Sequence, residues 1–386
     1  MARYVLHSLK IKESKMKILT LTPWYPNPAN NGAGTFVKEQ MSVIAKYGEH
    51  DVIVIATFPT NKFSEIDVKS TKLEKGSLTE ILVPYKPEKT IFDKFMKRKS
   101  AIKKGFAKIN SLKPDLFHVH EYQMVPIARS LISDVPIILT EHSSTLSANL
   151  GIKKYLAISA FKKANVIIAV SEYQRNKILP LEKNAKVFVI NNFVDDIFLN
   201  AKKVIRVDNN EIRIISVGNL IDKKGFKFLI NVTSKLDQRF SLTIVGDGPQ
   251  KEELRVLVNE LKLENKVFFT GSLDRISVLK KLTESDIFVS ASKIETFGIA
   301  ILEALAVGLP VVTYDNGGVR DFMTDSCGII VTDYTTEAFV NSINVLVNNI
   351  NEYDPLKIKN YVIKNFSAEK FAEKLNKIYK ENTVCF

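Results

Sequence analysis

Short runs of apolar and β-branched residues alternate along this chain with longer segments in which apolar residues recur every three or four positions. In the first half the runs are Lys17–Thr22, Asp51–Ala56, Leu116–Val119, Pro136–Leu139, Val166–Val170 and Val187–Ile190. In the second half they are Ile212–Val217, Leu242–Val245, Val267–Thr270, Ile287–Ser290, Pro310–Tyr314 and Gly328–Val331. Such runs are typical of parallel strands that helices cover on both faces. The pattern predicts an α/β chain with two doubly wound, Rossmann-like sheets.

The strand and helix pattern is interrupted between the two sets of runs, over residues 196–211, which end in a polar Asp-Asn-Asn-Glu cluster. Beyond the last strand, Glu337–Asn349 and Ala368–Lys380 have the spacing of amphipathic helices. Ligands of such sheets bind at the carboxyl ends of the strands, so two facing sheets predict an interdomain cleft. The predicted organisation is a possible extension over 1–15, a first domain over 16–195, a linker over 196–211, a second domain over 212–355, and a helical segment over 356–386 that packs back across the cleft.

Composition excludes several classes of protein. Of 386 residues, 45% are apolar, and 23 Phe and 12 Tyr can build a sizeable core, which excludes a disordered chain. Only two cysteines are present, so a disulfide scaffold is excluded and a reducing compartment is predicted. No apolar run reaches the length of a membrane-spanning helix, and the N-terminus has no apolar segment typical of a secretory signal. These features predict a soluble, cytoplasmic protein.

The excess of positive charge is concentrated in one half of the chain. Residues 1–199 hold 30 basic and 18 acidic side chains, whereas residues 200–386 hold 25 and 24. Ten of the basic residues lie in 86–113, where apolar residues at roughly helical spacing oppose them. Such a segment fits an anionic partner, either a membrane surface or a nucleic acid, although an ordinary surface helix packed on the sheet has the same pattern.

The segment 286–313, DIFVSASKIETFGIAILEALAVGLPVVT, contains the clearest candidate chemistry. It predicts a strand, a loop, a helix over about 299–307 and a further strand. Gly298 stands where the loop enters the helix, so the amides of Gly298, Ile299 and Ala300 would point out of the helix N-terminus and favour a phosphate. Glu295 and Glu303 flank this site, and a carboxylate accepts hydrogen bonds from vicinal hydroxyls. Alternatively, Glu303 only favours the helix N-terminal half and Glu295 is a solvated loop residue.

Two other strands of this half end in glycine-rich loops: GNLIDKKG over 218–225 and VGDGP over 245–249. With ETFGIAILEALAVGLPVV and Gly317-Gly318, these segments resemble the retaining nucleotide-sugar glycosyltransferases of the GT-B fold, in family four. In the first half the resemblance extends to WYPNPANNGAGTFVKEQ, PDLFHVHEY, ILTEHSS, IAVSEYQ and VINNFVD, so it spans about residues 16–380.

The resemblance implies a role for each matching residue. Glu303 would bind the nucleotide ribose, the amides of 298–300 the diphosphate, and Glu295 the transferred sugar. Lys224 takes the place of the lysine that neutralises the diphosphate. Asn219 stands where the family often has an arginine, a loss that Lys223 or Arg320 could compensate. The remaining candidates are Gly248 on the donor side, His142 near the transferred sugar, and Gly34 and Thr35 in the loop that closes over donor and acceptor.

For His142, a satisfied polar residue at a strand end is the alternative interpretation. His118 and His120 are predicted to be structural, with one ring hydrogen-bonded in the core. No Asp-x-Asp, no phosphate-binding lysine loop and no Cys-x-x-Cys occur. We therefore expect no metal and no cofactor. The resemblance implies a nucleotide-diphosphate sugar as donor substrate.

By resemblance, the first domain binds the acceptor and the second the donor, and the enzyme is a metal-independent, retaining hexosyltransferase. The predicted acceptor is a lipid-linked glycan of a cell-surface polysaccharide such as a capsule, reached by peripheral binding of 86–113 to the inner face of the membrane. Two alternatives stay open: a nucleotide-sugar epimerase on a similar fold, and a basic nucleic-acid-binding protein, against which the lack of RNP or zinc-finger motifs argues.

Overall fold

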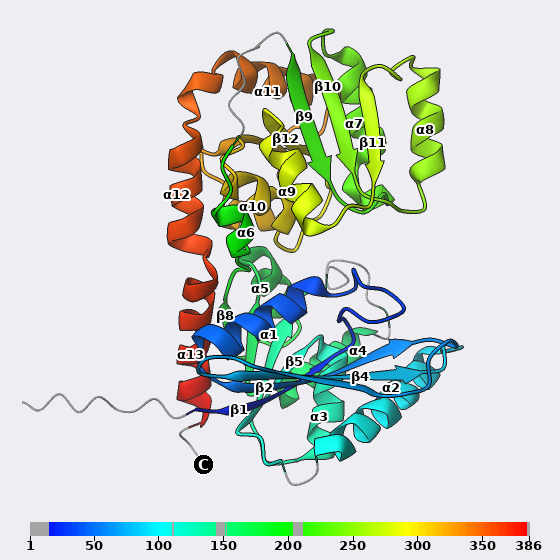
Figure 1. The fold of residues 1–386 in the computed structure, drawn as a ribbon, viewed down its shortest axis with the longest axis vertical. Coiled ribbons are helices and arrows are strands. Elements are labelled where there is room, and N and C mark those ends of the chain that lie inside the picture. Colours follow the sequence, from blue (N-terminus) through cyan, green and yellow to red (C-terminus); the bar gives the residue numbers. More distant parts are fainter. Residues whose placement is uncertain (1–14, 110–111, 144–150, 152, 204–210, 384–386) are drawn as a thin grey trace, which may run out of the picture. The chain divides into compact units, whose positions relative to one another are not determined.

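The computed structural model describes residues 15–109, 112–143, 151, 153–203 and 211–383. The described chain contains two mostly parallel sheets flanked by helices, as the hydrophobic pattern predicts (Figure 1). The described chain divides into two compact units. The first contains residues 15–109, 112–139, 163–165 and 376–383, and the second contains residues 140–143, 151, 153–162, 166–203 and 211–375. Residues 1–14 of the possible extension over 1–15, and residues 204–210 of the predicted linker over 196–211, lie outside the described residues. The predicted domain limits stay a prediction.

The first sheet has eight strands in the order β3-β4-β2-β1-β5-β6-β7-β8. Its strands are β1 (Lys17–Thr22), β2 (Asp51–Pro59), β3 (Asp67–Lys72), β4 (Ser77–Tyr85), β5 (Leu116–His120), β6 (Ile137–Glu141), β7 (Val166–Ala169) and β8 (Val187–Val189). Strand β3 pairs antiparallel with β4, whereas β2 pairs parallel with both β1 and β4. The helices of this part of the chain are α1 (Thr35–Tyr47), α2 (Ile91–Phe106), α3 (Val125–Leu131), α4 (Lys153–Lys163), α5 (Glu172–Ile178) and α6 (Asp196–Leu199).

The second sheet has six parallel strands in the order β11-β10-β9-β12-β13-β14. They are β9 (Ile212–Val217), β10 (Phe240–Val245), β11 (Val267–Gly271), β12 (Ile287–Ser290), β13 (Val311–Tyr314) and β14 (Gly328–Val331). Its helices are α7 (Phe226–Lys235), α8 (Lys251–Glu260), α9 (Arg275–Thr283), α10 (Ile299–Ala306), α11 (Thr336–Asn348) and α12 (Pro355–Phe366), and α13 (Ala368–Thr383) ends the described chain.

Two apolar clusters bury the two faces of the second sheet. One contains Leu229 of α7, Leu254 of α8 and Phe339 of α11, and the other contains Leu282 of α9 and Ile301 of α10, all fully buried. A parallel sheet covered in this way leaves only the carboxyl ends of its strands and the loops after them to build a ligand site.

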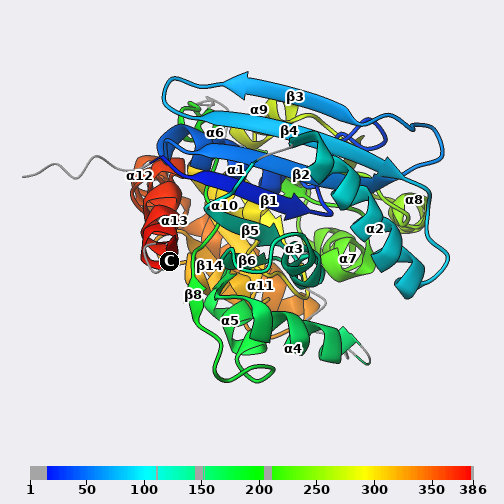
Figure 2. The ribbon, with the colours of Figure 1, turned by 90° about the horizontal axis from the view of Figure 1, so that it is seen from below.

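Helix α2 packs on the first sheet against β2 and β4 (Figure 2). Gly105 allows this close packing, because a Cβ there would lie 2.8 Å from Ile55 Cγ2 and 2.9 Å from Val83 Cγ2. The rings of His118 and His120 are fully buried and stacked, and His118 Nδ1 lies 2.6 Å from the Tyr379 hydroxyl. His118 is therefore a hydrogen-bonded histidine of the core, as the sequence predicts for one of the two.

Candidate active site

Glycine-rich loops lie side by side at one edge of the second sheet. The loops after β10, β9, β12 and β13 come from four neighbouring strands, and all of these strands are parallel. These loops carry most of the candidate donor-binding residues: Asn219, Lys223, Lys224, Gly248, Glu295 and Gly298. The topology therefore brings together segments that are far apart in the sequence, such as those of Asn219 and Gly298.

An ion pair joins two of these loops. Lys224 Nζ lies 2.5 Å from Glu295 Oε1, and the two side chains are 21% and 16% exposed. Gly225 makes this approach possible, because it has a φ of 70° and a Cβ there would lie 2.2 Å from the Ala291 carbonyl oxygen. The Lys293 amide also donates to the Lys223 carbonyl oxygen at 2.9 Å. An ammonium group and a carboxylate are thus held together at the carboxyl ends of β9 and β12.

Helix α10 begins at Ile299, four residues after Glu295. Gly298 precedes its first turn with a φ of 102°, a conformation that a residue with a side chain rarely adopts. The amides of Ile299 and Ala300 stand in the first turn, where helix geometry leaves N–H groups without intrahelical partners. The first turn of α10 therefore has the geometry of an anion site.

Glu303, one turn further along α10, is only 7% exposed. Its Oε1 lies 3.2 Å from Arg275 Nη2 at the start of α9, and Arg275 Nη2 lies 3.7 Å from Asp195 Oδ2. The Arg275 guanidinium also stacks over the Phe198 ring, 5.1 Å from its centroid. The sequence prediction did not include Arg275, because nothing in its position after Asp274 distinguishes it from an ordinary first-turn residue.

The loops after β9 and β10 pack closely on each other. A Cβ on Gly248 would lie 2.6 Å from the Leu220 carbonyl oxygen, and one on Gly246 would lie 1.9 Å from that of Gly218. Asn219 and Lys223 are exposed at the surface of this pair of loops. Arg320, the other residue considered as a substitute cation, binds Asp315 through two hydrogen bonds of 2.9 and 2.6 Å.

His142, Gly34 and Thr35 lie apart from these loops in the chain. His142 follows β6 and is partly buried, and burial lowers the pKa of its imidazole to about 3. Its ring is therefore neutral near pH 7. Gly34 precedes α1 with a φ of 58°, and a Cβ there would lie 2.3 Å from the Trp24 carbonyl carbon. Gly34 and Thr35 belong to the first compact unit, whereas His142 and the donor-side candidates belong to the second.

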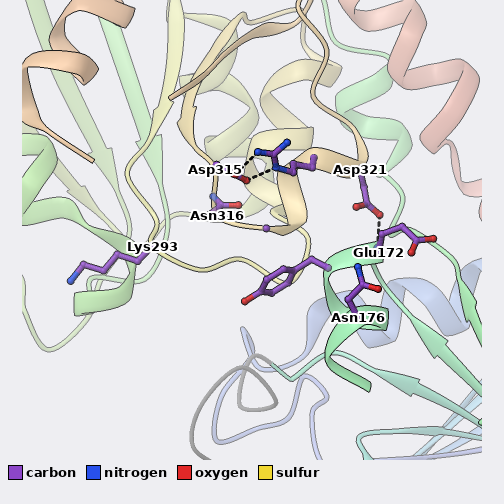
Figure 3. Close-up of a pocket in the computed structure, with 9 residues that line it drawn as sticks. Glu172, Asn176, Lys293, Asp315, Asn316 and Asp321 are labelled. Atoms are coloured by element: carbon purple, nitrogen blue, oxygen red, sulfur yellow. Dashed lines mark hydrogen bonds and ion pairs between the residues drawn. The ribbon is translucent and has the colours of Figure 1, made fainter. Parts of the chain in front are cut away.

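A cavity of about 410 Å³ lies beside the Glu295 loop. Its lining comes from α5 and from the loop after β13, together with Lys293 (Figure 3). Within the described residues, no cluster of three or more His, Cys, Asp or Glu side chains is placed to hold a metal ion.

Two family models match the chain: glycosyltransferase family 4 over residues 30–197, and glycosyl transferases group 1 over residues 198–361. The chain belongs to these glycosyltransferases. The family inferred from the motifs at Glu295–Glu303 and 218–225 is thereby confirmed.

One relative and two solved structures illustrate the similarity. The putative teichuronic acid biosynthesis glycosyltransferase TuaC of Bacillus subtilis is 26% identical over 357 residues, which are 85% of this chain and 88% of that protein. The sucrose-phosphate synthase of Thermosynechococcus elongatus superposes with a TM-score of 0.81 at 17% identity, over 96% of this chain and 100% of that one. Anabaena HepE in complex with UDP-glucose superposes with a TM-score of 0.73 at 18% identity, over 95% of this chain and 100% of that one. These structural likenesses confirm the GT-B fold of two Rossmann-like domains.

No helix among the described residues of this glycosyltransferase has the length and apolar character needed to cross a membrane.

Proposed function

We propose that this glycosyltransferase moves a sugar from a nucleotide-diphosphate donor to a glycan acceptor with retention of the donor's anomeric configuration. The observation that carries the proposal is the Lys224–Glu295 ion pair, in which Glu295 belongs to the loop that leads into the first turn of α10. Together, the ion pair and the first turn of α10 provide a cation, a carboxylate and helix N-terminal amides at the carboxyl ends of the strands of one sheet. A sugar diphosphate needs these three partners, for its phosphates and its hydroxyls.

In the proposed complex, the diphosphate binds to Lys224 and to the amides of Gly298, Ile299 and Ala300. Glu295 accepts hydrogen bonds from the hydroxyls of the transferred sugar, and Glu303 from those of the ribose. The exposed Asn219 and Lys223 and the close-packed Gly248 complete the donor side.

In the proposed reaction, the bond between the anomeric carbon and the phosphate oxygen breaks, and its electron pair stays on the departing diphosphate. The acceptor oxygen bonds to the same face of the anomeric carbon and passes its proton to a phosphate oxygen. Negative charge develops on the diphosphate, where Lys224 and the amides of α10 stabilise it. We infer that these groups supply the positive field without a metal ion. His142 is neutral, so we assign it a hydrogen bond to the transferred sugar rather than a proton transfer.

Thermal-shift measurements with UDP-, GDP-, ADP- and dTDP-sugars test the donor class. We expect one nucleotide series to raise the melting temperature, and turnover with that donor to persist in EDTA. No shift with any of the four would contradict donor binding, and loss of activity in EDTA that Mg²⁺ or Mn²⁺ restores would overturn the metal-free mechanism. Conversion of the donor without an acceptor would favour the epimerase.

For the acceptor we propose a lipid-linked glycan of a cell-surface polysaccharide. The relative from Bacillus subtilis is named for teichuronic acid biosynthesis, which is consistent with this class. Gly34 and Thr35, where the preceding loop enters α1, are the proposed acceptor-side residues of the N-terminal domain.

We further propose that α2 and the residues after it dock on an anionic membrane surface. Phe92 and Met96, one turn apart on α2, are 73% and 47% exposed, and Lys103, Lys104 and Lys108 are exposed as well. Exposed apolar side chains beside lysines are typical of helices that bind at an interface. Two members of the charged run serve the fold instead: Lys97 pairs with Asp93 at 2.7 Å, and the buried Arg98 donates to the Tyr85 hydroxyl.

Replacing Lys99, Lys103, Lys104 and Lys108 by Gln is expected to abolish sedimentation with anionic vesicles, because each such lysine contributes about 1 kcal/mol at low salt. Activity on a lipid-linked acceptor should fall, and activity on a short soluble analogue should persist. The matched control replaces the exposed Lys357, Lys364, Lys370 and Lys374. Vesicle binding unchanged by the first set would contradict membrane docking, and tighter binding of RNA than of vesicles would favour the nucleic-acid alternative.

A further inference from the structure

The cavity beside the Glu295 loop contains a buried amide without a hydrogen-bond partner. The Asn316 side chain is 3% exposed, lines the cavity, and has neither its Oδ1 nor its Nδ2 bonded to any of the residues that the structure describes. A buried polar group in this state is costly and is usually satisfied by a ligand or an ordered water. Since the amide offers an acceptor oxygen and an NH2 donor group, its best partner is a hydroxyl group, which both donates and accepts.

The rest of the wall favours a neutral ligand over an anion. Glu172, Asp315 and Asp321 contribute three carboxylates. The two cations are engaged and mostly exposed: Arg320 binds Asp315, and Lys293 lies 3.2 Å from Asp222 and extends away from the other lining residues (Figure 3). An anion here would face the carboxylates with little compensation. Carboxylate, amide and aromatic groups together are suited to the hydroxyls and C–H faces of a sugar.

The two walls of the cavity are tied to each other. On the α5 side, the Glu172 amide donates to Asp321 Oδ2 at 2.9 Å, and the Ser171 hydroxyl donates to the Thr296 carbonyl oxygen at 2.5 Å. The Tyr173 ring lies against Gly317, where a Cβ would approach the ring Cδ2 to 2.5 Å. The cavity is therefore built into the fold, and at about 410 Å³ it is within the range of small-molecule sites.

The cavity also adjoins the proposed donor site. The Glu295 amide donates to the Asn316 carbonyl oxygen at 3.0 Å, and the Gly318 amide donates to the Glu295 carbonyl oxygen at 3.1 Å. Residues 316–318 therefore form one hydrogen-bonded unit with the residue that we assign to the transferred sugar.

We propose that this cavity binds a neutral saccharide unit through Asn316, Asn176 and Tyr173. In the reaction it holds the acceptor glycan next to the transferred sugar. The acceptor role rests on the proposed function, whereas saccharide binding at this place does not.

Saturation-transfer difference NMR with maltose, lactose and chitobiose tests the proposal on the full chain, with inorganic phosphate as the anionic probe in a separate titration. We expect at least one disaccharide to give a signal that saturating UDP does not displace. Asn316→Leu should abolish this signal, and the matched control Asn259→Leu, at an exposed position of α8, should keep it. The melting temperature of Asn316→Leu should be no lower than that of the wild type, because an unpaired buried amide has been removed.

No binding of any of the three disaccharides would overturn the proposal and leave water as the partner of Asn316. A disaccharide signal that survives in Asn316→Leu, or that UDP displaces, would also overturn the proposal. Phosphate binding that only this variant loses would overturn it as well, because the cavity would then be an anion site. Wild-type protein that binds the disaccharide but no nucleotide would contradict the proposed function and leave the saccharide site standing.

Discussion

Replacing Lys224 by alanine is expected to lower kcat by roughly 10²–10³ and to weaken donor binding much less. The diphosphate gains its additional charge only as the glycosidic bond breaks, so the ammonium group stabilises the transition state more than the bound donor. The substitution also leaves the Glu295 carboxylate, 16% exposed, without the cation that now lies 2.5 Å away. Initial rates over a range of donor concentrations separate the two effects.

Lys227→Ala is the matched control for this prediction. Lys227 lies one residue beyond the start of α7, is 62% exposed and pairs with Glu253 at 3.1 Å on the surface. Removing an exposed pair of this kind costs little, so the variant should keep wild-type kinetics. A Lys224→Ala enzyme with unchanged kcat and a raised KM would show that Lys224 only binds the donor.

The fold was predictable where strands are apolar throughout. All six strands of the second sheet coincide with predicted runs to within two residues. In β12 and β13 every residue is buried, and burial on both faces leaves a nearly uninterrupted apolar pattern. Strands β3 and β4 were missed for the opposite reason. Every residue of β3 is exposed, and β4 alternates between buried and partly buried positions. The fully exposed edge strand β3 and the alternating strand β4, which lies between β3 and β2, therefore give little hydrophobic signal.

For the candidate site, the sequence predicts the local segments but not the contacts between them. The strand-loop-helix segment around Gly298 follows from the sequence because glycine is needed at a φ of 102°. The contacts that Lys224 and Glu303 make are tertiary, across 71 and 28 residues of sequence, and no local pattern encodes them. Charge alone does not show which basic residues are available to a partner. Arg98 belongs to a basic run, yet it is buried and donates a hydrogen bond to Tyr85.

The Glu303–Arg275 pair changes what a substitution at Glu303 does to stability. Glu303 is buried and ion-paired, so Glu303→Ala would leave a cavity beside the Arg275 guanidinium and lower the melting temperature. Glu303→Gln preserves the shape and one acceptor oxygen, and Asp195 remains 3.7 Å from Arg275 as a second carboxylate. The glutamine variant is therefore the better probe of ligand binding.

We expect Glu303→Gln to weaken binding of the preferred nucleoside diphosphate by roughly 10- to 100-fold, since a hydrogen bond to a charged acceptor contributes about 1.5–3 kcal/mol. Calorimetry with the 2′-deoxy and 3′-deoxy analogues makes the test specific. The wild type should bind at least one analogue more weakly than the ribonucleotide, and Glu303→Gln should largely lose that preference. The loss measures the coupling energy between the Glu303 carboxylate and the ribose hydroxyl, as in a double-mutant cycle. Glu252→Gln, at an 80% exposed side chain of α8, is the control. Equal discrimination by wild type and Glu303→Gln would assign ribose recognition to another residue and leave Glu303 as the structural partner of Arg275.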